Sequence, residues 1–350
     1  METFGDSHNL GKRVRLNGNV LVKPRSTYFE KLFLNKSSEL RNFFRNSNTS
    51  LEELDTYYPD LKFTEVNSGI CFAETKITKL EESIPSEISK FLCRSIGKNI
   101  ALMQWFGISD LHCQNMMFFQ KNNMTSVCPI DIEVIFSDIF YPSQSYLIGK
   151  KNGVAGFKKI EEINYDNPLE NFIEIFKSYT ETIESLNFLK PKIESLLQEI
   201  LPKDAVVRAI FRDTQMYINK SNIEKYEESE RVQLKRGDVP FYYKSIWEDK
   251  YYFISENEGI KSVPFQELNE LKKNTKGLPQ DFLKYFERKN IVDRLKTTLT
   301  IAEIYSYFKP SNTYGKHKCN NIEIDFDSNS ISIKGIKIKC KVTKDYLSAS

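Results

Sequence analysis

Two short stretches decide the fold that we expect: Ser109-Asp110-Leu111-His112-Cys113-Gln114-Asn115 and, further along, Pro129-Ile130-Asp131-Ile132-Glu133-Val134-Ile135-Phe136. The first stretch brings a carboxylate, an imidazole and an amide within a few residues of one another. The second places a carboxylate inside an apolar run that is typical of a buried strand. Carboxylate and amide oxygens are ligands that Mg²⁺ prefers. We therefore expect one polar site built from Asp110, Asn115 and Asp131.

The spacing of these residues suits phosphoryl transfer. That reaction needs a carboxylate near the accepting hydroxyl, a metal-binding amide, and a second carboxylate that holds the metal against the nucleotide phosphates. The step from Asp110 to Asn115 equals the step in a protein-kinase catalytic loop. His112 departs from that pattern and gives a D-x-H-x-x-N loop, which resembles the loop of phosphoinositide-type kinases. The prediction is a kinase in which Asp110 and His112 are catalytic, while Asn115 and Asp131 bind Mg²⁺.

Each of these residues also has an ordinary structural interpretation. Asp110 could cap a helix or a turn, Asn115 could be a loop residue, and His112 could be a hydrogen-bonded core histidine. Asp131 and Glu133 could form the solvent face of a strand. One residue alone favours the ordinary role, whereas the joint spacing favours the kinase interpretation.

The composition predicts a globular protein without a nucleic-acid or membrane partner. The chain has 350 residues, enough for one large or two modest domains, and 40% of them are hydrophobic. Its 50 basic and 47 acidic residues nearly cancel, to a net charge of +3. The N-terminus lacks the apolar core of a secretory signal, and no run approaches about eighteen apolar residues. We expect a cytoplasmic protein.

The cysteines are scattered and predict free, buried thiols rather than a zinc site. They form no C-x-x-C pair and no close group with histidine. Their positions are Cys71, Cys93, Cys113, Cys128, Cys319 and Cys340.

The N-terminal part has the pattern of a small nucleotide-binding lobe. An apolar run from Asn19 to Arg25 predicts a strand that ends in a turn, and Ser26 is placed to cap a helix over residues 28–34. Apolar residues then return at helical spacing from Glu82 to Trp105. We expect that second helix to deliver the chain to the catalytic loop.

Beyond the metal loop the pattern is mainly helical. Residues 137–166 are irregular and glycine-containing, in the place where a kinase has its substrate-facing activation segment. Residues 168–201 predict two helices broken near Pro191, and residues 282–308 predict another amphipathic helix. The alternating tail at residues 322–334 predicts a hairpin with its turn near residues 327–330.

A series of further motifs follows a fixed order along the chain. They are Gly5-Asp6-Ser7-His8 with Gly11 and Val14, Val22-Lys23-Pro24-Arg25-Ser26, Phe63-Thr64-Glu65, the two loops above, Arg208 to Tyr217 as R-x-x-x-R-x-T-x-x-Y, and Gly237-Asp238-Val239-Pro240-Phe241. In this order they resemble the dehydratase domain of class II lanthipeptide synthetases, whose catalytic core is similar to a lipid kinase. Phe63 stands where that family has Trp, and Gln114 where it has Glu.

The resemblance implies a two-step activity with ATP and Mg²⁺. Ser or Thr hydroxyls of a ribosomal precursor peptide would be phosphorylated, and the phosphate then eliminated to leave dehydroalanine or dehydrobutyrine. Lys23 would pair with the nucleotide phosphates, and Asp6 and His8 resemble the family's substitute for a phosphate loop. Arg208 with Thr214 would grip the departing phosphate.

The resemblance also implies an α+β, two-lobed, kinase-like fold close to that of lipid kinases. Residues 1–105 would form the small mixed N-lobe. Residues 106–350 would form the larger, mainly helical C-lobe with the catalytic loop, the metal loop, the activation-like segment and the elimination residues. The three histidines cannot supply the zinc centre of a cyclase, so a separate cyclase or leader-binding protein is an expected partner.

Simpler interpretations of these motif residues stay open. Lys23 before a proline could be a strand-end lysine, and the stretch Gly5–His8 could be a disordered start. Arg208 and Arg212 could be surface ion-pair partners on one helix face, and Thr214 a buried hydroxyl.

Three functions therefore remain in competition. The first is a stand-alone peptide Ser/Thr kinase and phosphate lyase. The second is a kinase that acts on a peptide, a protein or a small molecule and stops there. The third is a degenerate pseudokinase that binds a precursor peptide or a partner synthetase.

Overall fold

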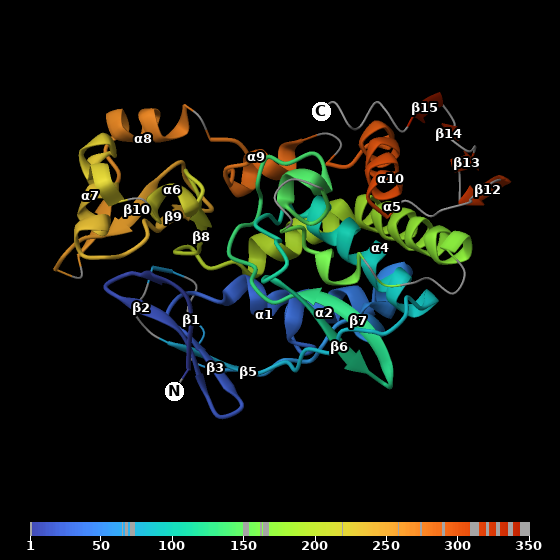
Figure 1. Ribbon diagram of the computed structural model, residues 1–350, viewed down its shortest axis with the longest axis horizontal. Coiled ribbons are helices and arrows are strands. Elements are labelled where there is room, and N and C mark those ends of the chain that lie inside the picture. The colour runs from blue at the N-terminus through green and yellow to red at the C-terminus, as the bar shows by residue number, and fades with distance from the viewer. Residues whose placement is uncertain are drawn as a thin grey trace.

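Helices and antiparallel sheets alternate along the chain (Figure 1). The computed structural model describes residues 2–64, 66, 69–70, 74–149, 154–161, 163, 168–218, 220–257, 259–273, 275–288, 291–308, 315–319, 322–326, 330–334 and 339–343. Every strand pairing within these ranges is antiparallel. The expected mixed class of helices and strands is confirmed at this level.

A five-stranded sheet forms the N-terminal part, in the order β1-β2-β3-β5-β4. Its strands are β1 (Glu2–His8), β2 (Lys12–Asn17), β3 (Val20–Lys23), β4 (Phe63–Thr64) and β5 (Thr75–Thr78). The predicted strand ending at Lys23 is β3, which lies at the centre of the sheet between β2 and β5. Lys23 is the last residue of this strand and pairs with Thr75 of β5, which fixes the backbone from which its long side chain extends.

Short helices follow the sheet: α1 (Tyr28–Leu34), α2 (Glu39–Arg45), the 3-10 turn η1 (Ser50–Glu53) and α3 (Leu54–Tyr57). The helix predicted over residues 28–34 is confirmed, but its predicted cap is wrong. The residue at the cap position is Thr27, whose side chain makes no capping hydrogen bond, and Ser26 lies one position too early. Burial of Phe29, Leu32 and Phe33 holds α1 in place instead.

Helix α4 (Lys90–Trp105) begins later than the sequence predicts. The predicted start at Glu82 is wrong because Pro85 disfavours helical backbone before it. Ser89 supplies the true start, since its hydroxyl accepts a hydrogen bond of 3.2 Å from the amide of Leu92. The last eight residues of α4 are all buried, and they lead directly to the catalytic loop.

Helix α5 (Pro168–Ile200) crosses α4 at close range and is continuous (Figure 1). The predicted break near Pro191 is wrong. Leu189 and Ile193 on either side of this proline are buried, so packing of both turns outweighs the missing hydrogen bond. The crossing is tight because a Cβ at Gly97 of α4 would collide with the carbonyl oxygen of Ile175.

A two-stranded hairpin of β6 (Met116–Lys121) and β7 (Met124–Pro129) lies between the catalytic and metal loops. Met116 pairs with Pro129 at its open end. Asn115 and Asp131 therefore extend from neighbouring strand ends although many residues separate them in sequence.

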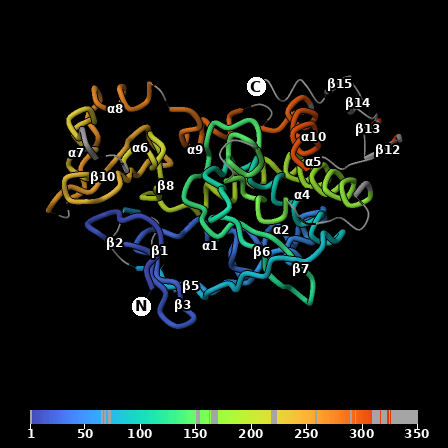
Figure 2. The backbone as a smooth tube through the Cα atoms, viewed as in Figure 1, coloured from blue at the N-terminus to red at the C-terminus, as the bar shows by residue number. Residues whose placement is uncertain are grey.

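A second antiparallel sheet has the order β11-β10-β9-β8. Its strands are β8 (Val206–Ala209), β9 (Tyr242–Ser245), β10 (Tyr251–Ile254) and β11 (Ile260–Ser262), and its helical elements are α6 (Gln215–Ile218), η5 (Lys220–Lys225), α7 (Glu228–Lys235) and α8 (Phe265–Lys272). The tube in Figure 2 shows this unit beside β1 and β2. Arg208 lies on β8, so its alternative placement on a helix face is wrong.

The C-terminal part consists of two helices and a meander. These elements are α9 (Phe282–Glu287), α10 (Arg294–Phe308), β12 (Gly315–Cys319), β13 (Ile322–Phe326), β14 (Ser330–Lys334) and β15 (Lys339–Thr343). The single helix predicted over residues 282–308 is thus two helices. The predicted tail hairpin is confirmed by the pairing of β13 with β14, while residues 327–329 of its turn lie outside the described ranges.

The predicted irregular segment after the metal loop is confirmed in its described parts. It contains only the 3-10 turns η2 (Pro142–Ser145) and η4 (Lys158–Ile160), and residues 150–153 are not described. Cys93 and Cys128 are free and buried, and Cys113 is free and partly exposed. The side chains of the other three cysteines lie outside the description. Among the described helices, none combines the length and apolar character needed to cross a bilayer.

Candidate functional site

The predicted catalytic loop (residues 109–115) and the predicted metal loop (residues 129–136) meet at the open end of the β6–β7 hairpin. The carbonyl oxygen of Asn115 accepts a hydrogen bond of 2.9 Å from the amide of Ile130. The Asn115 side chain donates through Nδ2 to the carbonyl oxygen of Asp110, at 2.7 Å. Asn115 therefore joins the loop that holds Asp110 to the loop that holds Asp131, and these three predicted residues lie in one region.

Asp110 has a left-handed backbone conformation, with φ of 62°. This region is unfavourable for most side chains but is tolerated by Asp and Asn. The adjacent Leu111 amide donates to the carbonyl oxygen of Ser145 at 2.8 Å, which holds the loop from its other side. Strained backbone of this kind is common where a side chain must be aimed at a substrate.

The carboxylate of Asp110 lies between two basic side chains. Arg208 Nη1 is 4.0 Å from one of its oxygens and His112 Nε2 is 3.9 Å from the other. Burial raises the pKa of Asp110, and the charges of Arg208 and His112 oppose that rise. A carboxylate with a raised pKa is a stronger proton acceptor than an ordinary surface carboxylate.

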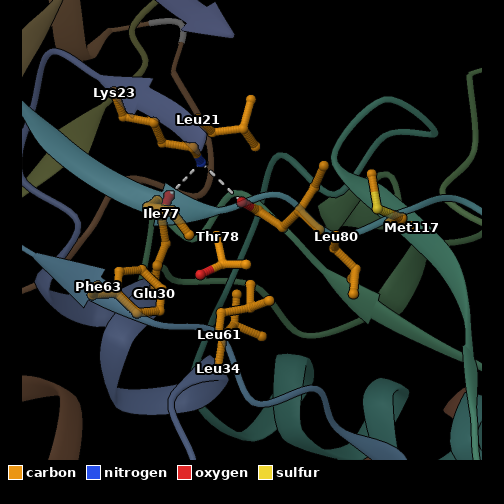
Figure 3. A pocket seen from close by; sticks show the side chains of 11 residues that line it. Leu21, Lys23, Glu30, Leu34, Leu61, Phe63, Ile77, Thr78, Leu80 and Met117 are labelled. Carbon is orange, nitrogen blue, oxygen red and sulfur yellow. Dashed lines mark hydrogen bonds and ion pairs between the residues drawn. The ribbon is translucent and has the colours of Figure 1, made fainter. Parts of the chain in front are cut away.

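The ammonium group of Lys23 is buried and has three oxygen partners, of which Figure 3 shows Glu30 and Ile130. Nζ lies 2.9 Å from Glu30 Oε1, 2.9 Å from the carbonyl oxygen of Ile130 and 3.6 Å from Asp131 Oδ1. The pair of Lys23 on β3 with Glu30 on α1 is similar to the strand-lysine and helix-glutamate pair that protein kinases need for activity.

Two residues in this cluster, Glu30 and Arg25, were missed by sequence reasoning. Arg25 Nη1 lies 3.0 Å from Glu30, while Nη2 contacts Asp131 and Nε contacts Glu133. Burial raises the pKa of Glu30 despite the nearby charges of Arg25 and Lys23. The available signal was the Lys-Pro-Arg-Ser motif for Arg25 and, for Glu30, a lone acid in an otherwise apolar helix.

Asp131 is ionised and is contacted on one oxygen. Burial opposes its ionisation, but Arg25 and then Lys23 hold the pKa of Asp131 below its usual range. Both basic groups contact Oδ1. A hydrogen bond from Glu30 also lowers the pKa of Asp131. Among the described residues no basic group contacts Oδ2, so this oxygen is the candidate metal ligand.

The donor set fits a magnesium ion that arrives with a nucleotide. Asp131 Oδ2 and the Oδ1 of Asn115 are hard oxygen donors, and the remaining positions suit phosphate oxygens and water. Within the described part of the chain, no cluster of three His, Cys, Asp or Glu side chains could hold a metal alone. These residues would therefore hold Mg²⁺ only together with substrate phosphates.

Arg208 lies against Glu133 and an aromatic ring. Its Nη1 is 2.8 Å from Glu133 Oε2, and its backbone amide donates to the carbonyl oxygen of Glu133 at 2.9 Å. The guanidinium lies over the ring of Phe241, 4.8 Å from the centroid. No partner is described for its Nε and Nη2, so these nitrogens are donors open to an anion.

His8 lies on the Arg208 side of the site. Its Nδ1 is 2.9 Å from the carbonyl oxygen of Val239, and its ring is 5.2 Å from that of Phe241. Burial and then the charge of Arg208 lower the pKa of His8. The neutral ring must carry its proton on Nδ1 to donate to a carbonyl, which leaves Nε2 unprotonated. Asp6, the other residue predicted in this motif, is exposed.

Asp238 anchors the turn between β1 and β2. It accepts hydrogen bonds from the Ser7 hydroxyl at 2.7 Å, the Leu10 amide at 2.8 Å and the Gly11 amide at 2.9 Å, and it pairs with Arg236 at 2.6 Å. The first and last motifs of the sequence therefore bind each other. Asp238 belonged to a quoted motif but had no predicted role.

Among the described residues, no hydrogen bond joins Thr214 to Arg208, whose Nη1 instead donates to Glu133. It is half-buried at the start of α6, and its carbonyl oxygen accepts from the Tyr217 amide at 3.0 Å. Arg212 pairs with Glu230 at 2.8 Å, and the Tyr217 hydroxyl donates to the same carboxylate at 2.6 Å. Arg212 and Tyr217 thus hold residues 212–217 against Glu230 of α7. Of the two arginines in this motif, Arg208 is the one that lies close to Asp110.

A small apolar hollow with about 20 Å³ of enclosed space lies next to Lys23 and Glu30 (Figure 3). Leu21 and Ile77 line it from the sheet, and Met117 and Ile130 belong to the hairpin and the metal loop. Its walls are apolar, and its polar end carries the Lys23–Glu30 pair. The sheet and the hairpin would have to move apart for this hollow to admit an aromatic ring.

Comparison with known proteins adds no relative. A scan against protein-family models, a search of curated proteins and a search of solved structures each found no match to this chain. Functional conclusions therefore depend on the residues and their geometry.

Proposed function

We propose that the protein phosphorylates Ser or Thr hydroxyls of a ribosomal precursor peptide with ATP and Mg²⁺, and then eliminates the phosphate to give dehydroalanine or dehydrobutyrine. Its fold would be a two-lobed, lipid-kinase-like arrangement divided near residue 105. One observation carries the proposal: Lys23, Asp110, Asn115 and Asp131 gather around the same loops, next to an apolar hollow.

The nucleotide would bind along the hollow and the Lys23–Glu30 pair. The adenine ring suits the apolar walls that Leu21 and Met117 help to form. Lys23 would then contact the phosphates at the polar end of the hollow. Glu30 Oε1 lies 2.9 Å from Lys23 Nζ and would hold the lysine ammonium group in position. Mg²⁺, when bound by Asn115 and Asp131, would neutralise charge on the β- and γ-phosphates.

In the first step Asp110 would accept the proton of the substrate hydroxyl. The hydroxyl oxygen forms a bond to the γ-phosphorus while the bond from that phosphorus to ADP breaks. His112 lies 3.9 Å from the carboxylate and would orient it. The raised pKa of Asp110 supports its role as the base.

In the second step a base removes the Cα proton, the Cα–Cβ double bond forms, and the Cβ–oxygen bond to phosphate breaks. Arg208 would bind the departing phosphate through Nε and Nη2. His8 is suited to take the proton, because its ring is neutral and Nε2 is unprotonated.

A kinase that stops after phosphorylation is the second candidate. It needs only the residues of the first step, namely Lys23, Asp110, Asn115 and Asp131, and makes no demand on Arg208 or Thr214. A pseudokinase that binds a precursor peptide or a partner is less well supported, because Lys23, Asp110 and Asp131 are all present and charged groups surround them. In either case a separate cyclase or leader-binding protein remains a proposed partner.

Peptide mass separates the three candidates. The protein is incubated with ATP, Mg²⁺ and a Ser/Thr-containing precursor peptide, and the peptide is weighed. A loss of about 18 Da per site supports the two-step proposal, whereas a gain of about 80 Da supports a kinase alone. No change with any precursor tested, together with no nucleotide binding, would favour the pseudokinase.

A further inference from the structure

Arg25 is the cation of the site that contacts the most carboxylates. Each of its three guanidinium nitrogens contacts a different carboxylate: Nη1 lies 3.0 Å from Glu30, Nη2 contacts Asp131, and Nε contacts Glu133. The side chain is only 8% exposed. A guanidinium keeps its charge in proteins, and its planar fork matches carboxylates on several sides. Arg25 is therefore a fixed positive charge that contacts both carboxylates of the metal loop, Asp131 and Glu133.

Basic side chains, Arg25 among them, already contact the carboxylate oxygens that would have to bind a second metal ion. On Asp131, Oδ1 is contacted by both Arg25 and Lys23. On Glu133, Oε1 is contacted by Arg25, and Oε2 lies 2.8 Å from Arg208. Of the four carboxylate oxygens in the metal loop, only Asp131 Oδ2 has no described basic partner. Protein kinases, in contrast, hold two Mg²⁺ ions on an equivalent Asp and Asn.

We infer that the site takes a single divalent cation with its nucleotide, and that the guanidinium of Arg25 stands permanently in place of a second metal ion. The inference rests on the proposed function, because it concerns the same nucleotide site. Arg25 is a positioning residue in this scheme: it holds Asp131 and Glu133 and does not touch the reacting atoms.

Charge supports a single ion. Glu133, the other carboxylate of the metal loop, is contacted by two guanidinium groups, those of Arg25 and Arg208. A second divalent ion placed on Glu133 would be repelled by both fixed charges, because screening by water is weak there. An ion on Asp131 Oδ2 and Asn115 uses the one metal-loop oxygen that no described basic group contacts, and it would still reach the phosphates.

Counting bound manganese tests the inference without measuring activity. Mn²⁺ is titrated by electron paramagnetic resonance into the protein saturated with a non-hydrolysable ATP analogue. The expected count for the wild-type protein is one Mn²⁺ per complex, with no dipolar broadening between ions. Arg25→Lys should also bind one. Arg25→Gln frees oxygens on Glu30, Asp131 and Glu133 and should bind two.

A matched control removes the same charge elsewhere. Arg231 on α7 pairs with Glu228 on the surface, so Arg231→Gln should leave the count at one. Two ions in the wild-type protein would overturn the inference, and so would a folded Arg25→Gln variant that still binds one. If circular dichroism shows that Arg25→Gln is unfolded, the wild-type and Arg25→Lys counts decide. A wild-type protein that binds neither the analogue nor Mn²⁺ would instead overturn the proposed function.

Discussion

Glu133 forms ion pairs with two arginines: its Oε2 lies 2.8 Å from Arg208 Nη1, and its Oε1 contacts Arg25 Nε. The Glu133 carboxylate therefore connects Arg25, which also contacts Asp131, with Arg208, the residue proposed to bind the departing phosphate. A phosphate dianion that arrives at Arg208 would compete with Glu133 for the same guanidinium. The two proposed steps thus share one set of charges rather than occupying separate sites.

Replacement of Arg208 should separate the two steps. In Arg208→Ala, the departing phosphate loses its charged donor, so elimination should slow by about 100-fold while phosphorylation continues. Peptide mass should then show an accumulated phosphopeptide, about 80 Da heavier than the substrate. Arg231→Ala, which removes a surface guanidinium, is the control. Dehydration at the wild-type rate in Arg208→Ala would remove Arg208 from the elimination step.

Replacement of Glu30 should impair the first step. Glu30→Gln keeps the shape of the side chain but removes the charge that holds the Lys23 ammonium group at 2.9 Å. We expect phosphorylation to fall by about 10- to 100-fold, because a misplaced catalytic contact has an effect of that order. The phosphorylation rate and the melting temperature are measured together. A full phosphorylation rate in a folded Glu30→Gln variant would contradict the role given to the pair.

The pH dependence of elimination should follow His8. Burial and the charge of Arg208 lower the pKa of His8 below its ordinary value of 6.5, so the ring stays neutral at neutral pH. A base acts only when unprotonated. The rate with a synthetic phosphopeptide should therefore be highest at neutral and higher pH and fall in acid, with a midpoint below pH 6.5. His8→Ala should abolish this profile, and a profile that survives the replacement would assign the base elsewhere.

Asp238 should stabilise the fold in a pH-dependent way. Burial alone would raise the pKa of Asp238, but hydrogen bonds from Ser7, from Arg236 and from the amides of Leu10 and Gly11 hold this pKa below its ordinary value. The stabilisation is therefore complete above the unfolded pKa of about 4 and is lost as the pH falls through the lower folded value.

The matching variant is Asp238→Asn. At pH 7 its free energy of unfolding should be lower than that of the wild-type protein by about 1–3 kcal/mol, because buried donors lose a charged partner. This difference in unfolding free energy between Asp238→Asn and the wild-type protein should become smaller in acid, where Asp238 is protonated. Urea unfolding at several pH values measures it, and an equal difference at pH 7 and pH 3 would contradict this account.

The sequence predicted those parts of the site whose partners are close in the chain. Asp110 and Asn115 belong to one short loop, and a hairpin brings Asp131 to them, so local pattern was sufficient. The strand that ends at Lys23 was predicted for the same reason. Each of these features depends on periodicity or spacing over a few residues.

The residues that sequence reasoning missed have distant or buried partners. Asp238 binds Ser7, which lies 231 positions away, and no local pattern indicates such a pair. Glu30 has the ordinary pattern of a helix acid until its burial is known. The break predicted at Pro191 failed because tertiary packing on both sides of the proline outweighed local preference.

The most direct test of the central claim is a structure of the protein with a non-hydrolysable ATP analogue and Mg²⁺. The base should occupy the hollow beside Leu21 and Met117, Lys23 should contact the phosphates, and the ion should bind Asp131 Oδ2 and Asn115 Oδ1. A nucleotide bound elsewhere, or a hollow that stays empty at a saturating concentration of the analogue, would contradict the account.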